Sequence, residues 1–155
     1  MANPQGQANP QGQANPQGQS EARKLAHVER IPIRWGDMDA MGHVNNIVYF
    51  RYMEQARISW FEHLVPGADA WKSTGIVIAN ASCNFRRAMT YPGTVEVKVF
   101  IARPGRSSVA TYYELSIESE IYADGAAVVV FIDMPTQKPL PIPEEIRALL
   151  HSFSI

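Results

Sequence analysis

The chain has 155 residues and a formal net charge of −1, so it lacks the basic stripe that neutralises nucleic-acid phosphates, and we expect no nucleic-acid partner. No run approaches the roughly 20 consecutive apolar residues of a membrane span, and the start lacks the basic and apolar regions of a signal peptide, so we expect no membrane partner. The single cysteine, Cys83, excludes an internal disulfide and fits a reducing, cytoplasmic compartment, and the four histidines show no metal-ligand spacing.

The first nineteen residues differ in composition from the rest of the chain. They repeat the hexad ANPQGQ three times and contain no Asp, Glu, Lys or Arg. Their few apolar side chains cannot offset the roughly 1–2 kcal/mol per residue that is lost when a backbone is fixed. We therefore expect residues 1–19 to be a disordered tail and residues 20–155 to form a single domain.

The first half of that domain predicts a strand followed by a long helix. Residues 28–35 alternate loosely and contain Pro32, which is typical of a strand at a sheet edge or one that ends in a bulge. Residues 46–64 follow a helical pattern that Pro66 and Gly67 end. Apolar residues cover most of the circumference of this helix and leave a narrow polar stripe of Arg51, Gln55, Ser59 and Glu62. Such a helix is expected to lie inside the fold.

After residue 75 the period changes from that of a helix to that of strands. Strands are predicted over residues 76–85, 94–102, 108–120 and 126–133, with a tight hairpin at Asp124-Gly125. Pro143 and two glutamates then open a short last helix. The order predicts an α+β fold in which one curved sheet wraps one helix. Apolar side chains such as Phe100 face away from that helix, so we expect a homo-oligomer.

The polar segment directly before the long helix is the candidate site. Backbone N–H groups in the first turn of a helix lack intrahelical partners and can hold an oxyanion. Asp39 is either a general base or nucleophile, or a residue that shapes the turn, whereas Asp37 suits a structural role. His43 either moves a proton or supports the loop, and Asn45 or Asn46 caps the helix. The segment suits acyl transfer or hydrolysis.

Other charged and aromatic residues have two interpretations each. Glu54 and Arg57 form a surface or interface pair on the helix. Arg86-Arg87 and Arg106-Ser107-Ser108 lie at strand ends, where they either grip a phosphorylated ligand or are solvated. Three residues of the helix either line a pocket or belong to the core, namely Tyr49, Met53 and Trp60.

The chain resembles the hotdog-fold acyl-CoA thioesterases of the 4-hydroxybenzoyl-CoA thioesterase type over about residues 28–150. The matching pieces are RWGDMDAMGHVNNIVYFRYMEQAR (34–57), NFRRAMTYPGTVEV (84–97), GRSS (105–108) and AAVVVFIDMPTQKPLPIPEEIR (126–147). The resemblance implies a sheet of about five strands around one long helix, dimers with sites at subunit interfaces, and commonly tetramers. It also implies cleavage of an acyl-CoA to a free acid and CoA without a metal or organic cofactor.

The resemblance also assigns roles to residues. The family's catalytic carboxylate falls on Asp39, and the backbone N–H that polarises the thioester carbonyl falls on Asn46. His43 and Asn45 match the GHVNN form of the motif, which occurs in relatives that act on fatty acyl-CoAs. The positions where relatives contact the CoA nucleotide are Arg106 and Ser108, with Ser107 between them in place of a basic residue.

Two other functions remain open from the sequence. On the same fold, His43 and Asp39 of a hydratase or dehydratase would move protons on an enoyl chain. Alternatively, the protein is a non-catalytic acyl-CoA-binding module whose carboxylates only cap the helix.

Overall fold

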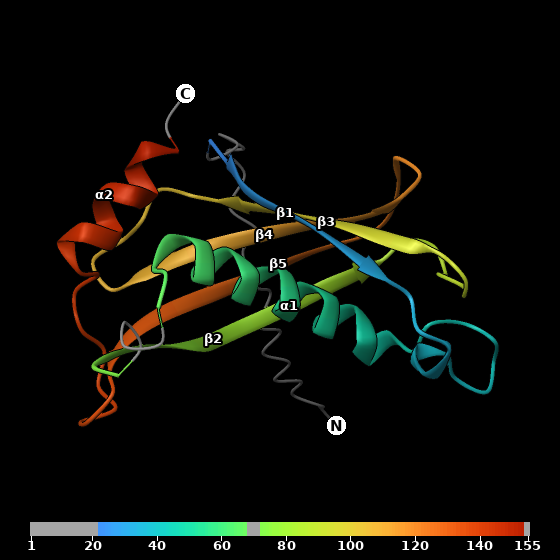
Figure 1. The fold of residues 1–155 in the computed structure, drawn as a ribbon, viewed down its shortest axis with the longest axis horizontal. Helices are drawn as coiled ribbons and strands as arrows, with labels where there is room; N and C mark the ends of the chain where they lie inside the picture. The colour runs from blue at the N-terminus through green and yellow to red at the C-terminus, as the bar shows by residue number, and fades with distance from the viewer. Residues whose placement is uncertain (1–21, 68–71, 154–155) are drawn as a thin grey trace, which may run out of the picture.

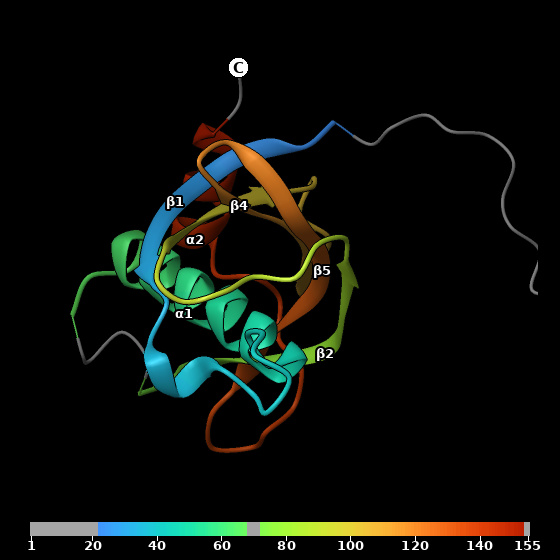
Figure 2. The same cartoon turned by 90° about the vertical axis from the view of Figure 1, so that its right-hand side faces the viewer.

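One curved antiparallel sheet wraps around a long helix in the computed structural model, which describes residues 22–67 and 72–153 (Figures 1 and 2). The predicted tail, residues 1–19, lies outside these residues. The elements in chain order are β1 (Lys24–Pro32), the 3-10 turn η1 (Trp35–Asp37), α1 (Asn46–Leu64), β2 (Thr74–Phe85), β3 (Thr94–Ile101), β4 (Ser108–Ile117), β5 (Glu120–Asp133) and α2 (Glu144–Ser152). This architecture confirms the α+β hotdog fold.

The strand order is β1-β3-β4-β5-β2, so the succession of strands along the chain is not the order in the sheet. Only β3, β4 and β5 pair with their neighbours in sequence, whereas β2 pairs with β5 and lies at one edge. At the other edge, β1 pairs with β3. The sheet consequently curves around one side of α1, with β1 and β2 at its two edges (Figure 2).

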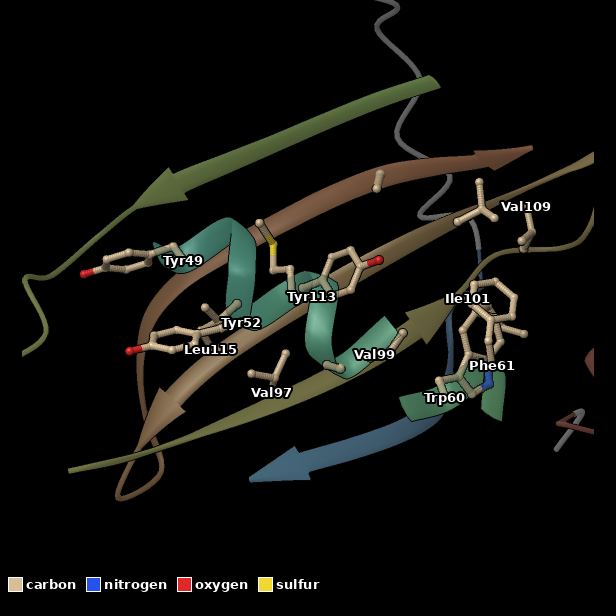
Figure 3. Close-up of a cluster of buried hydrophobic side chains, with 14 of the residues drawn as sticks. Tyr49, Tyr52, Trp60, Phe61, Val97, Val99, Ile101, Val109, Tyr113 and Leu115 are labelled. Atoms are coloured by element: carbon tan, nitrogen blue, oxygen red, sulfur yellow. The ribbon is translucent and has the colours of Figure 1, made fainter. Parts of the chain in front are cut away.

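The helix α1 has the bounds that its sequence pattern predicts, but it is covered on one side only. Its buried side faces the concave surface of the sheet and carries Tyr49, Tyr52, Met53, Ala56, Arg57, Trp60, Phe61 and Leu64. Figure 3 shows aromatic side chains of this face close to the buried valines and isoleucine of β3 and to residues of β4. The predicted narrow polar stripe is wrong, because Ile47 and Ile58 are 63% and 41% exposed on the other side.

The predicted pair between Glu54 and Arg57 is also wrong. Arg57 is buried at 8% exposure, and its Nη1 donates to the hydroxyl of Tyr113 at 3.0 Å. Within the described residues no ion pair joins Arg57 to Glu54, which is exposed. Residues three apart share a helix side, but the curved sheet covers the position of Arg57 and not that of Glu54.

The predicted hairpin at Asp124-Gly125 is wrong, because both residues lie inside β5. The turn between β4 and β5 consists of Glu118 and Ser119, whose φ angles are 50° and 69°. At Gly125 an added Cβ would lie 2.4 Å from the sulfur of Met53 and 2.8 Å from the carbonyl oxygen of Ser82. The glycine therefore permits a close approach within the sheet rather than a turn.

The first strand runs from Lys24 to Pro32 rather than over residues 28–35. Its pairing with β3 extends from Lys24 opposite Ile101 to Pro32 opposite Thr94. Beyond the proline, which cannot donate to a ladder, the N–H of Ile33 donates to Gly93 and the chain enters η1. The strand therefore delivers the chain to the segment that precedes α1.

Candidate active site

The loop before α1 is held in place by Asp37. Its carboxylate accepts hydrogen bonds from the backbone N–H of Arg34 and from the hydroxyl of Tyr52, each at 2.8 Å. Its carbonyl oxygen accepts from the N–H of Asn45 at 2.9 Å. Burial, with the added hydrogen bond to Asp37, raises the pKa of Tyr52 well above its usual range. Asp37 therefore links the loop to the helix and occupies the structural position expected for it.

Asp39 shapes the same loop with one of its carboxylate oxygens. Its Oδ1 accepts from the backbone N–H of Met41 at 2.8 Å and of His43 at 3.5 Å. Its own N–H donates to the carbonyl of His43, and Gly42 takes a φ of +78° to close the turn. No hydrogen bond to Oδ2 occurs within the described residues. The residue therefore forms the turn and still presents a carboxylate oxygen.

Two neighbouring asparagines have different roles at the start of α1. The side chain of Asn45 caps the helix, because its Oδ1 accepts from the N–H of Ile47 at 3.0 Å. The N–H of Val48 donates to the carbonyl of Asn45. The N–H of Asn46, the first helical residue, has no hydrogen-bond partner in the part of the chain that the structure describes. This N–H lies at the positive end of the helix dipole and can donate to an oxyanion.

The opposite wall of the site is the segment that follows β2. The N–H of Val44 donates to the carbonyl of Met89 at 2.9 Å. The buried hydroxyl of Tyr49 donates to the carbonyl of Arg87 and accepts from the N–H of Met89, both at 3.1 Å. Burial raises the pKa of Tyr49, so the phenol stays protonated in this bridge. Tyr49 also packs edge-on against Phe85, with ring centroids 5.0 Å apart.

Between the loop and this wall lies a pocket of about 280 Å³, open to solvent, at the N-terminal end of α1. The residues that line it are Asp39, His43, Val44, Asn46, Tyr49, Phe85, Arg86, Arg87 and Ala88. The three predicted catalytic residues and Tyr49 thus lie together, whereas the side chain of Asn45 is used as the cap. Sequence reasoning did not place Phe85 or the two arginines here, since only the tertiary contact between residues 44 and 89 brings their segment to the loop.

The two arginines of this wall are ion-paired within the chain. Arg86 pairs with Asp124 and Arg87 with Glu120, and their side chains remain 60% and 55% exposed. The nearby thiol is a poor candidate nucleophile, because burial, with a further contribution from Asp124, raises the pKa of Cys83 to about 11. The carboxylate of Asp39 is therefore the candidate base or nucleophile in the pocket.

The predicted nucleotide contacts lie elsewhere on the protomer. Arg106, Ser107 and Ser108 come after β3, whereas Gly93, whose carbonyl accepts from Ile33 at the start of the loop that carries Asp39, precedes β3. Eight residues of β3 at about 3.3 Å each separate the two places by roughly 26 Å. The carbonyl of Arg106 accepts from the N–H of Ile142 at 2.8 Å and from Arg147 at 2.9 Å. One protomer therefore does not bring these residues to Asp39.

The described residues contain neither a metal-binding cluster nor a membrane-spanning helix. Within residues 22–67 and 72–153, no group of three or more His, Cys, Asp or Glu side chains is arranged to hold a metal ion. No helix in these same ranges is long and apolar enough to cross a membrane.

Comparisons with known proteins agree with this geometry. Residues 33–150 match the family model described as the thioesterase-like superfamily. The long-chain acyl-CoA thioesterase FadM of Escherichia coli is 27% identical in an alignment of 129 residues that covers 80% of this chain and 96% of that protein. A solved Pseudomonas aeruginosa protein, PA2801, for which thioesterase activity is suggested, is 34% identical with a TM-score of 0.74, covering 82% of this chain and 99% of that one.

A further solved structure is a thioesterase of Thermus thermophilus in complex with coenzyme A and zinc. It is 30% identical, with a TM-score of 0.74, and the match covers 84% of this chain and 95% of that one. These findings confirm the predicted resemblance and the prediction of a thioesterase enzyme. The chain belongs to the thioesterase-like superfamily.

Proposed function

We propose that this protein hydrolyses acyl-CoA thioesters to a free carboxylic acid and CoA. The observation that carries the proposal is the pairing, in one pocket, of an Asp39 oxygen and an Asn46 N–H that have no hydrogen bond within the described residues. The names of FadM and of the CoA-bound Thermus thioesterase support the choice of substrate class.

The proposed chemistry uses the backbone and one carboxylate. The thioester carbonyl oxygen accepts from the N–H of Asn46, and the positive end of α1 stabilises the negative charge that develops on that oxygen. Asp39 either attacks the carbonyl carbon or removes a proton from the attacking water. The tetrahedral intermediate then collapses and expels the CoA thiolate, which takes up a proton. Where Asp39 is the nucleophile, this collapse leaves a mixed anhydride on Asp39, and water hydrolyses it to the free acid and restores the carboxylate. His43, at the pocket edge, is placed to contact the thioester or to carry that proton.

The substrate's length favours an assembly of at least two copies. Arg106, Ser107 and Ser108 are the candidate contacts of the CoA nucleotide, and Asp39 acts at the thioester. One acyl-CoA can reach both places only where one protomer supplies the nucleotide contacts and a second protomer supplies Asp39. On the outer face of the sheet, Leu25 pairs with Phe100 and Phe100 with Tyr112, which leaves an apolar strip for further association. We therefore propose a homodimer that pairs into a homotetramer, acting in the cytoplasm.

The proposal is tested by a thiol-release screen across acyl chain lengths on the wild type and on Asp39→Asn. We expect the wild type to release CoA and the variant to lose on the order of 10²-fold or more in turnover, with little change in thermal stability. Near wild-type hydrolysis by Asp39→Asn would refute the assigned role. A change in enoyl absorbance with crotonyl-CoA without free thiol would indicate a hydratase, and ligand-dependent stabilisation without turnover would indicate a binding module.

We also propose that residues 20–155 form the catalytic domain and that the ANPQGQ repeats are dispensable. All strands and helices of the described residues, and the whole candidate pocket, lie between Lys24 and Ser152. A chain that begins at Ser20 is therefore expected to keep the turnover of the full chain in the same thiol-release assay. A large loss of turnover would assign the repeats a part in activity.

A further inference from the structure

A buried arginine on α1 is fixed in orientation by a chain of hydrogen bonds. Arg57 is 8% exposed, and its Nη1 lies 3.0 Å from the hydroxyl of Tyr113, which is 2% exposed. That hydroxyl lies 2.8 Å from Oγ1 of Thr111, which donates to the carbonyl of Ala127 at 3.2 Å. A guanidinium can only donate, so Tyr113 accepts from Arg57 and donates to Thr111. Among these four residues, only the guanidinium has side-chain donors without a hydrogen-bond partner in the described part of the protein.

The guanidinium is charged and has donors left over. Within the described residues the Tyr113 hydroxyl is its only hydrogen-bond partner, and no carboxylate pairs with it. Among the described residues, no nitrogen of Arg57 is both fully buried and without a hydrogen-bond partner. Because Arg57 lines a cavity, its remaining donors face open space and are available to an acceptor on a ligand.

A cavity lies beside these donors. It has a volume of about 230 Å³ between α1 and the strands β2, β4 and β5, and its walls are mainly apolar. Arg57 and Tyr113 line it together with Phe50, Met53, Glu54, Ile78, Ala81, Ala126 and Ala127. Figure 3 shows Tyr113 reaching from β4 toward the helix. The cavity thus combines apolar walls with a small number of hydrogen-bond donors, as ligand sites commonly do.

The cavity and the candidate active site lie along one helix. Tyr49 lines the active-site pocket, whereas Met53 and Arg57, four and eight residues later on the same helix face, line the cavity. Arg57 follows Asn46 by eleven residues, which is about 16 Å of helix and roughly the length of an extended acyl chain of a dozen carbons. An acyl chain that carries its carbonyl at Asn46 and follows α1 past Tyr49 and Met53 would have the length to end near the guanidinium.

We propose that Arg57, held by Tyr113, binds an oxygen atom at the distal end of the acyl chain. The preferred substrates are then medium-chain acyl-CoAs that end in a hydroxyl or carbonyl group. Glu54 in the same lining already supplies a negative charge near the guanidinium and disfavours a second carboxylate, so the distal group is uncharged. This inference rests on the proposed thioesterase function and adds the substrate class to it.

The test compares matched substrates on one protein. Thiol release is measured for dodecanoyl-CoA and 12-hydroxydodecanoyl-CoA, with the same pairs at ten and fourteen carbons. We expect the wild type to favour the hydroxylated member of at least one pair by roughly tenfold or more in kcat/KM, because the unsubstituted chain leaves the donors unmatched. Arg57→Met is expected to remove that preference.

The ratio within a pair does not depend on how much of a variant is folded. If Arg57→Met does not fold, Tyr113→Phe is the second variant, because it keeps the arginine but removes the hydroxyl that orients it. The ratio of kcat/KM for the hydroxylated over the unsubstituted substrate is then expected to fall several-fold. Arg51 is exposed on the same helix, so Arg51→Met is the matched control and should leave the ratio unchanged. Equal kcat/KM within every pair in the wild type, or an equal loss for both members in Arg57→Met, would overturn the inference.

Two further readouts separate this inference from its alternatives. Calorimetric titration with 12-hydroxydodecanoate and dodecanoate tests the cavity without turnover, so a preference that Arg57→Met abolishes supports it even if no acyl-CoA is hydrolysed. Equal affinity for both acids in the wild type would count against it. A change from oligomer to monomer in Arg57→Met would also overturn it, because the guanidinium would then serve a contact between copies.

Discussion

At the scale of single residues, neighbouring asparagines have separate functions at the start of α1. Asn45 acts through its side chain, whereas Asn46 offers its backbone N–H. Asn45→Ala is therefore expected to lower the free energy of unfolding by about 1 kcal/mol, the usual cost of a lost cap. Urea denaturation measures this change, with Glu62→Ala, exposed on the same helix, as the control expected within about 0.5 kcal/mol of the wild type. An equal effect of both variants would contradict the cap.

Residue types and local spacing predict Asp39, His43 and Asn46 as one candidate site, because all three lie within eight residues of a helix start, and the structure places all three in the lining of one pocket. The same reasoning failed for Arg57, which it paired with Glu54. Spacing along a helix says which residues are neighbours, but not which side the sheet covers. The sequence does not place Arg86 and Arg87 at the site, because their position there depends on the hydrogen bond between Val44 and Met89.

At the scale of the elements, the turn between β4 and β5 carries strain that the sequence does not reveal. Glu118 and Ser119 both take positive φ values in a two-residue turn, where Asn-Gly is preferred. The double variant Glu118→Asn/Ser119→Gly is therefore expected to raise the free energy of unfolding by about 1 kcal/mol.

Gly125, inside β5, gives the opposite prediction. Gly125→Ala is expected to lower the free energy of unfolding by about 1–3 kcal/mol, because the added Cβ meets a backbone oxygen. Thermal unfolding checks both signs, and the opposite order would place the turn at Asp124-Gly125.

The helix and the strands differ in how much of them local sequence determines. The bounds of α1 were predicted because a capping asparagine and Pro66 mark its two ends within the chain itself. The strand ends depend on partners far away in sequence. Asp124-Gly125 has the composition of a hairpin, yet it lies mid-strand because Asn84 bonds Asp124 and Met53 packs where a Cβ would stand.

At the scale of the whole molecule, the two edges of the sheet differ. On β1 the edge carries Pro32 and several charged side chains, which discourage pairing with another strand. On β2 the edge runs for twelve residues, with Val77 and Ile78 at 42% and 38% exposure. The β2 edge also ends at Phe85, which lines the candidate active site. A second copy that pairs along β2 would therefore lie next to the site.

A charge on the β2 edge tests this assembly. Light scattering is expected to give the wild type a mass that is a multiple of 17.3 kDa, and Val77→Lys a mass closer to that of the monomer. A lysine at an edge that pairs with a second copy would lose its hydration or be repelled by the same lysine of that copy. Val28→Lys on β1, where the valine is also 42% exposed, is the matched control and should keep the wild-type mass. Thiol release is expected to fall with the loss of the assembly if the second protomer completes the site. A wild type that is monomeric and fully active would remove the need for a partner and leave Arg106, Ser107 and Ser108 without a part in catalysis at Asp39.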